Sequence, residues 1–148
     1  MEVKRLVNGY LVRLEPGEEV LESLVRFADA HRIGFGALRA IGTFERVTLG
    51  YYDTEDKVYR NHGLEEPVEV LSLSGNICKA EDGQRMVHAH TVVGRSDYST
   101  MGGHVVEATV GPTLEVIVET ATATIRRRQD ADTGLQLWDL GGMDTFAA

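Results

Sequence analysis

The sequence predicts an α+β fold, a mostly antiparallel β-sheet with one main amphipathic helix. Two observations support this fold class. One early segment has helical spacing of its apolar residues, and after Gly34 the chain breaks into short β-type runs separated by turn signals. The links between these runs are short enough for hairpins, which favours antiparallel pairing in meander order. One helix combined with many such strands is typical of an α+β domain.

The helix is expected over residues 18–31. Its apolar residues recur with a helical period and form one stripe, Val20, Leu21, Leu24, Val25 and Ala28. Glutamates in the first turns suit the positive end of the helix dipole. His31 stands at the other end, where a polar or cationic residue is ordinary, so we expect no functional role for it.

The strands are expected where the residues alternate or are rich in β-branched types, at 10–14, 36–41, 46–52, 57–59, 68–78, 86–93, 104–110, 113–119, 122–127 and 135–140. Turn residues separate them at 53–56, 81–83, 111–112 and 132–134. Two of the runs, 68–73 and 114–118, are apolar at nearly every position and suit strands covered on both faces.

The length of 148 residues fits a single domain, expected over 1–140. The tail 141–148 has two glycines and no apolar period, so we expect it to be mobile. A hydrophobic content of 43% and only 3 prolines exclude a disordered chain. No apolar run approaches the roughly 18 residues of a membrane helix, and no basic-then-apolar leader follows Met1. The one cysteine, Cys78, cannot form an internal disulfide, and a cytoplasmic protein is expected.

The charge balance opposes duplex DNA as the main ligand. The chain has 15 Lys and Arg against 23 Asp and Glu, a formal net charge of −8. Nucleic-acid binding depends chiefly on basic residues that neutralise phosphates. The single arginine cluster, 126–128, places Arg126 and Arg128 on one face of a strand, where a solvated or interface edge is favoured over a phosphate site.

Three of the five histidines are predicted to form a metal site. His88 and His90 lie two residues apart in a strand, so both point to the same face. The polar segment 94–100 can return the chain, and Gly102 and Gly103 would allow a sharp turn before His104. Three neutral imidazoles with one open position match a zinc site, although nickel, copper, iron or cobalt would also accept three nitrogens. The alternative is a pair of surface histidines with His104 in a turn.

Other residues carry weaker signals. His62 is interpreted as a loop histidine. Four carboxylates could supply a fourth ligand or a general base: Glu69, Glu107, Glu115 and Glu119. None of them can be assigned without knowing the strand register. The sequence contains no GxSxG, GxGxxG or Walker motif, so no catalytic nucleophile and no nucleotide cofactor are predicted.

At these residues the chain resembles the plants-and-prokaryotes-conserved (PPC) domain. Residues 86–90 and 102–104, Met-Val-His-Ala-His and Gly-Gly-His, resemble the HxH…GGH signature of that family. Residues 69–76 are similar to its central strand motif, and 14–17, 40–42 and 49–53 resemble further family segments. The resemblance covers about 10–140. It implies an α+β sheet fold that assembles as a homotrimer, with a divalent metal at His88, His90 and His104.

The resemblance also sets expectations about partners. In plants the domain follows AT-hook segments of nuclear DNA-associated proteins, and the hook makes the DNA contact. This chain has no Arg-Gly-Arg-Pro stretch, so the family's DNA-binding description transfers poorly and DNA contact is expected to be weak. Expected partners are other copies of the chain and a protein or small-molecule ligand, with no membrane contact. The resemblance supplies no settled enzymatic activity, so the enzyme question stays open, with a non-enzymatic role favoured.

These observations lead to one main prediction and one alternative. The main prediction is a homotrimeric, zinc-binding module with a regulatory or interaction role. Exposed sheet edges and a single helix that covers only part of one sheet face also argue for association between copies. The alternative is a metal-dependent enzyme that acts on a small molecule through the three histidines. It would need a base and a pocket beside them.

Overall fold

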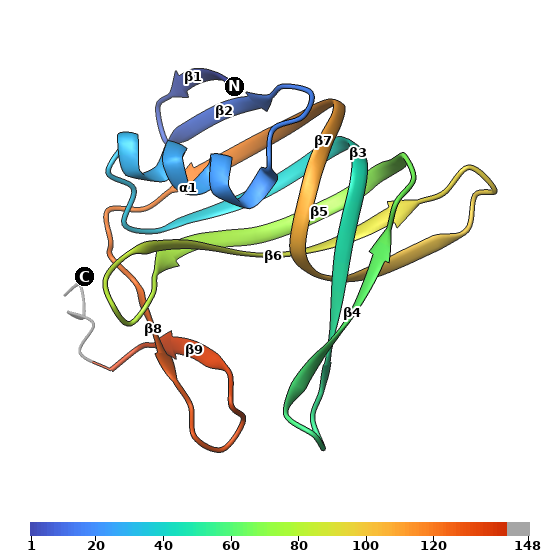
Figure 1. Cartoon of the computed structure of the whole chain (residues 1–148). Coiled ribbons are helices and arrows are strands. Elements are labelled where there is room, and N and C mark those ends of the chain that lie inside the picture. The colour runs from blue at the N-terminus through green and yellow to red at the C-terminus, as the bar shows by residue number, and fades with distance from the viewer. Residues whose placement is uncertain (142–148) are drawn as a thin grey trace.

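The computed structural model describes residues 1–141, and within this range the chain forms one helix and a nine-stranded sheet (Figure 1). The elements are β1 (Glu2–Leu6), β2 (Gly9–Leu14), α1 (Val20–Ala30), β3 (Gly36–Asp53), β4 (Val58–Leu64), β5 (Val68–Lys79), β6 (Arg85–Gly94), β7 (Thr100–Thr120), β8 (Arg126–Gln129) and β9 (Gln136–Asp139). The predicted α+β fold, mostly antiparallel with one main helix, is confirmed. The tail that was expected to be mobile, residues 141–148, lies outside the described residues except for Gly141.

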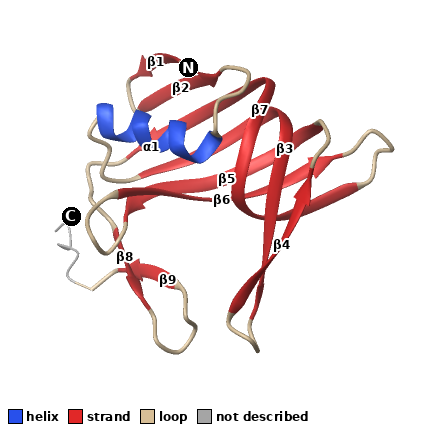
Figure 2. Ribbon diagram, in the orientation of Figure 1, coloured by secondary structure: helices blue, strands red, loops and turns tan. Residues whose placement is uncertain are grey.

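Four strands pair in a closed ring. β3 pairs with β5 and β7, and β6 also pairs with β5 and β7, so the sheet folds back on itself. β2 and then β1 continue the sheet from β7, and β4 pairs with β3 as part of a two-stranded arm (Figure 2). The predicted meander order is wrong, because β7 lies between β2 and β3.

Two strands are longer than the sequence predicts. The runs 36–41 and 46–52 join into β3, and 104–110 and 113–119 join into β7. Gly111 and Pro112 therefore do not form a turn. The register between β3 and β7 shifts near Phe44, where two residues of β3 oppose a longer stretch of β7. Such bulges bend a strand without ending it, so β7 can pair with β2 along one part of its length and with β6 along another.

Two smaller expectations also differ from the structure. His62 lies on strand β4 as an exposed residue, paired with Leu49, and not in a loop. β1 was not expected; its residues are all exposed and it pairs only with β2 in the described chain. An edge strand of this kind has no buried face, so its sequence lacks the apolar alternation that identifies a strand.

The helix packs on one face of the sheet. It starts at Val20, two residues after the predicted start, because the Glu19 side chain accepts a hydrogen bond from the backbone N–H of Glu22 at 2.6 Å and caps the first turn. Leu24 and Phe27 are fully buried against the strands. His31 ends the helix, as predicted, and its ring lies 4.7 Å from that of Tyr10. In the described chain, no helix is long and apolar enough to cross a membrane.

Most of the opposite face of the sheet has no cover within residues 1–141. Leu11, Ile41 and Ile117 are 44%, 61% and 42% exposed, and Leu71 is exposed as well. The expectation that 68–73 and 114–118 are covered on both faces is therefore wrong for a single copy of the described chain. We call this surface the uncovered face.

Candidate metal centre

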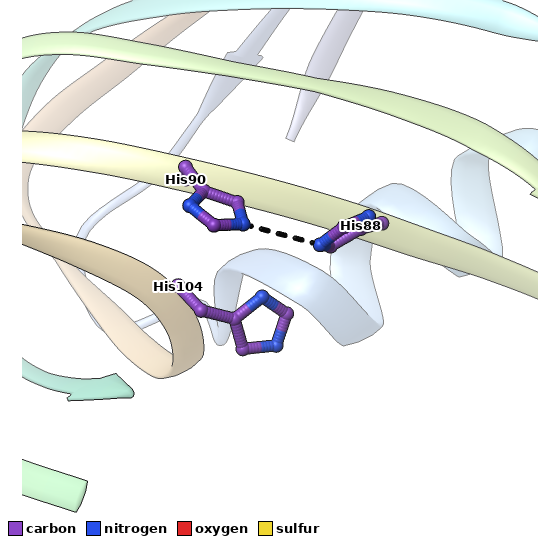
Figure 3. Close-up of side chains that lie close together, drawn as sticks. All are labelled: His88, His90 and His104. Carbon is purple, nitrogen blue, oxygen red and sulfur yellow. Dashed lines mark hydrogen bonds between the residues drawn. The ribbon is translucent and has the colours of Figure 1, made fainter. Parts of the chain in front are cut away.

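The three histidines come from two neighbouring strands. His88 and His90 point to the same side of β6, as their spacing predicts, and His104 lies on β7 directly opposite His90. Figure 3 shows the three rings converging between these strands. The predicted return of the chain after residue 94 is thus confirmed, and the structure brings all three candidate residues together.

The glycines before His104 have a different role from the predicted one. Gly102 and Gly103 belong to the extended strand β7 and make no sharp turn. A Cβ atom at Gly103 would lie 2.9 Å from the carbonyl oxygen of Gly50 on β3. The glycine therefore allows close approach of β3 and β7 next to His104, because any larger residue would push these strands apart.

The histidine cluster belongs to the uncovered face. Cross-strand partners share a face of a sheet. A single row of such partners runs from β2 to β6, and every member is exposed: Leu11, Ile117, Arg39, Ser74 and His90. The cluster is thus on the side of the sheet away from α1.

The spacing of the ring nitrogens fits a metal ion. The Nε2 atoms of His88 and His90 are 3.2 Å apart, and one nitrogen from each of the three rings lies within 4.8 Å of the others. Two nitrogens bound to the same tetrahedral zinc at its usual bond length are about 3.3 Å apart. Within the described residues, Nδ1 of His104 is buried and has no hydrogen-bond partner. A buried nitrogen without a partner is unfavourable, and a metal would satisfy it.

The surroundings keep two of the rings neutral. The pKa of His88 is lowered from 6.5 to about 4, chiefly by burial and then by the nearby Arg127 guanidinium, His104 and His90, in that order of importance. Burial also lowers the pKa of His104, with smaller effects from His90 and Arg127. Only the unprotonated imidazole can donate a lone pair to a metal, so these shifts favour the binding form at neutral pH.

Arg127 on β8 is a residue of the site that the sequence did not single out. Its Nη2 lies 2.9 Å from Nδ1 of His88 and 3.3 Å from the Asn76 side-chain oxygen. Its Nη1 donates to the backbone oxygen of Gln136 at 2.8 Å, and its Nε donates to the Cys78 sulfur at 3.3 Å. The side chain is 7% exposed.

The β8–β9 hairpin brings this arginine to the histidines. Arg126 and Arg128 are exposed on one face of β8, as predicted, and Arg127 points to the other. The Trp138 ring of β9 lies over the guanidinium, 5.6 Å from the ring centre to Cζ. Alternation along the arginine run indicates that its middle member faces the opposite way. The sequence gives no sign of what that face packs against.

The contact with Arg127 fixes the proton position on a neutral His88. A guanidinium only donates hydrogen bonds, so Nδ1 of His88 accepts from it. The proton of the neutral ring is then on Nε2, where it can be donated to Nε2 of His90. A metal at Nε2 requires this proton to leave. Arg127 therefore favours the His88 ring with its proton on Nε2, whereas a metal at Nε2 would require the ring with its proton on Nδ1.

The carboxylates considered as a fourth ligand lie elsewhere. No Asp or Glu among residues 1–141 joins the histidine cluster. Glu107 accepts from the hydroxyl of Thr48, and Glu119 pairs with Arg39. An aromatic residue flanks the cluster instead: the Tyr59 ring is 5.0 Å from the His104 ring, and burial raises the pKa of Tyr59.

Solved structures with the same fold come from several prokaryotes. A presumed DNA-binding protein from Bacteroides thetaiotaomicron is 31% identical, with a TM-score of 0.89, and the match covers 93% of this chain and 96% of that one. A plant- and prokaryote-conserved (PPC) protein from Pyrococcus horikoshii is 32% identical, with a TM-score of 0.83 and 93% of each chain covered. A metal-containing protein from Archaeoglobus fulgidus is also 32% identical, with a TM-score of 0.81, covering 93% of this chain and 94% of that one.

Sequence comparison finds a similar segment in a much longer protein. The bifunctional protein GlmU of Synechococcus sp. strain JA-3-3Ab is 38% identical over 97 residues, which are 64% of this chain and 14% of GlmU. The match thus spans about a seventh of that relative. The family model of the Plants and Prokaryotes Conserved (PCC) domain, the PPC domain of the resemblance above, matches residues 1–122. The chain therefore belongs to the Plants and Prokaryotes Conserved domain family.

Proposed function

We propose that the protein binds one divalent metal ion, with zinc as the first choice, through His88, His90 and His104. The observation that carries this proposal is the convergence of three ring nitrogens within 4.8 Å, and the buried Nδ1 of His104, which has no hydrogen-bond partner among the described residues, supports it. The metal-containing relative from Archaeoglobus supports it. Zinc suits three imidazoles, and cobalt or nickel would be accepted by the same donors.

The proposed role of the metal-loaded protein is that of a binding module that assembles as a homotrimer. Leu11, Ile41 and Ile117 leave apolar surface on the uncovered face, and a second copy of the chain is a suitable cover for it. The family resemblance supplies the threefold symmetry. The cluster borders this surface, so assembly would bring it close to a neighbouring copy.

A metal-dependent enzyme is the second candidate. Three protein ligands leave one coordination position open, as in catalytic zinc sites, and His90 is exposed to solvent. The observation against it is the absence of a carboxylate from the cluster within residues 1–141. A general base would have to come from another group.

Elemental analysis of the purified protein tests metal binding. The wild type is expected to hold about one zinc per chain, and the double variant His88→Ala, His90→Ala is expected to hold almost none while keeping its fold by circular dichroism. His62→Ala is the matched control, because this histidine is exposed on β4 and outside the cluster. Stoichiometric zinc in the double variant would overturn the proposal.

A further inference from the structure

The charge of Arg127 has no counterion in the described chain. Its side chain is almost fully buried, and its four hydrogen-bond partners are all neutral: Asn76, Cys78, His88 and Gln136. The neighbouring Arg128 shows the contrast, since it is largely exposed and pairs with Asp139 at 2.8 Å. A buried cation is unfavourable unless an opposite charge or a full set of acceptors compensates it.

A metal ion at the cluster increases this imbalance. Three neutral histidines do not reduce the charge of a divalent ion, and no carboxylate among residues 1–141 joins them. The guanidinium and the ion would be separated only by the His88 ring. With a metal on Nε2, the neutral ring carries its proton on Nδ1, and Arg127 then loses an acceptor. One N–H of the arginine, which points at the His88 ring, is then left without this acceptor.

We propose that Arg127 makes the metal-loaded cluster an anion-binding site, which takes a small carboxylate at the side of the metal that the histidines leave open. This inference rests on the proposed metal binding. A carboxylate fits because its negative charge offsets both nearby cations, and because one of its oxygens is a donor that the open coordination position can take. The exposure of His90 leaves an approach from solvent.

The anion-binding residue comes from outside the family match. The PCC model ends at residue 122, whereas Arg127 and Trp138 belong to the β8–β9 hairpin that follows. The hairpin thus adds a buried positive charge to a cluster built by β6 and β7. Ligand choice would then depend on this hairpin, and metal binding on the family sheet.

Cobalt-loaded protein gives a test that needs no enzymatic activity. The visible absorption of bound Co²⁺ reports its ligand environment, and acetate is the probe. Acetate is expected to change the wild-type spectrum saturably and to raise the cobalt affinity measured by calorimetry, because coupling between two ligands is reciprocal. Arg127→Met should bind cobalt at least as tightly as the wild type and weaken acetate binding by about tenfold or more. Arg126→Met, which removes an exposed arginine next to it, should behave as the wild type.

The outcomes separate this inference from the proposed function. Failure of the wild type to bind cobalt or zinc overturns both. Cobalt binding without any effect of acetate overturns only the anion site. It would mean that another group, such as an acidic side chain of a neighbouring copy, balances the charges of Arg127 and the metal ion. Equal acetate affinity in the wild type and Arg127→Met also overturns it. Arg127→Lys provides a second variant if the methionine variant does not fold, and it should weaken acetate binding less, because it keeps the charge without the planar fork.

Discussion

The two faces of the sheet differ in what their alternating residues do. On the face under α1, Val12, Leu14 and Leu114 are almost fully buried. On the other face, the same strands present Leu11 and Ile117 to solvent, in a row that ends at the histidine cluster. The first face forms the core, and the second leaves apolar side chains and the candidate metal centre open to solvent. The function proposed above therefore lies on the face that folding leaves open.

The sharpest test of this comparison uses two leucines on β2. Leu14 is 0% exposed and Leu11 is 44% exposed, three residues away on the other face. Leu14→Ala is expected to lower the free energy of unfolding by about 2–5 kcal/mol, because it leaves a cavity in the core. Leu11→Ala should lower it by less than about 1 kcal/mol. Urea unfolding at one protein concentration measures both, and equal losses would show that the two faces contribute alike.

The second test asks what covers the open face. Light scattering after size exclusion is expected to give three times the 16.3 kDa of one chain, and this mass should persist at high salt because apolar burial is not screened. Leu11→Arg with Ile117→Arg should reduce the mass to one chain. Val58→Arg is the control, since Val58 is exposed on β4. A stable wild-type mass of one chain would refute association, and a mass of two chains would refute the trimer.

A third test uses pH and metal-free protein. Folding lowers the pKa of His88 from 6.5 to about 4, so between these values the unfolded chain binds a proton that the folded chain does not. Stability from this group is complete above pH 6.5 and falls as the pH is lowered toward 4. With chelator present, His88→Gln should show a smaller loss of stability across this window. Identical pH profiles for variant and wild type would mean that burial does not hold the ring neutral.

The smallest effect is expected with DNA. Arg39 on the uncovered face lies 3.5 Å from Glu119, and the chain carries a net charge of −8, both of which oppose binding to phosphates. Duplex DNA should bind weakly and with strong salt dependence, with a Kd at or above the roughly 10⁻⁴–10⁻⁶ M of non-specific binding. Fluorescence anisotropy checks this. A sequence-specific nanomolar complex at physiological salt would show that assembly creates a basic surface, with Arg126 and Arg128 the first candidates.

Local signals in the sequence identified the helix and the histidine cluster. The spacing of Leu24 and Ala28 marks a helix face, and the two-residue spacing of His88 and His90 marks one side of a strand. The hairpin return to His104 followed from a short polar loop. All of these features depend on neighbours in the sequence, so pattern reasoning reaches them.

The remaining features depend on contacts between distant segments. Gly111 and Pro112 resemble a turn, but pairing with β3 holds them inside one bent strand. The insertion of β7 between β2 and β3 has no local signature. Arg127 could be given an orientation from alternation alone, but its contact with His88 requires the β8–β9 hairpin to pack over β5. Such packing is decided by the whole fold.

The continuity of β7 links the cluster to the core. The strand carries His104 near one end, and four residues later the backbone N–H of Ala108 donates to the Glu19 side chain that caps α1. We therefore expect the histidines and the helix to unfold together. Any compound that occupies the cluster stabilises the whole chain, by about 2.7 kcal/mol at a hundred times its Kd. Thermal melting can thus screen metals and anions against this protein before any substrate is known.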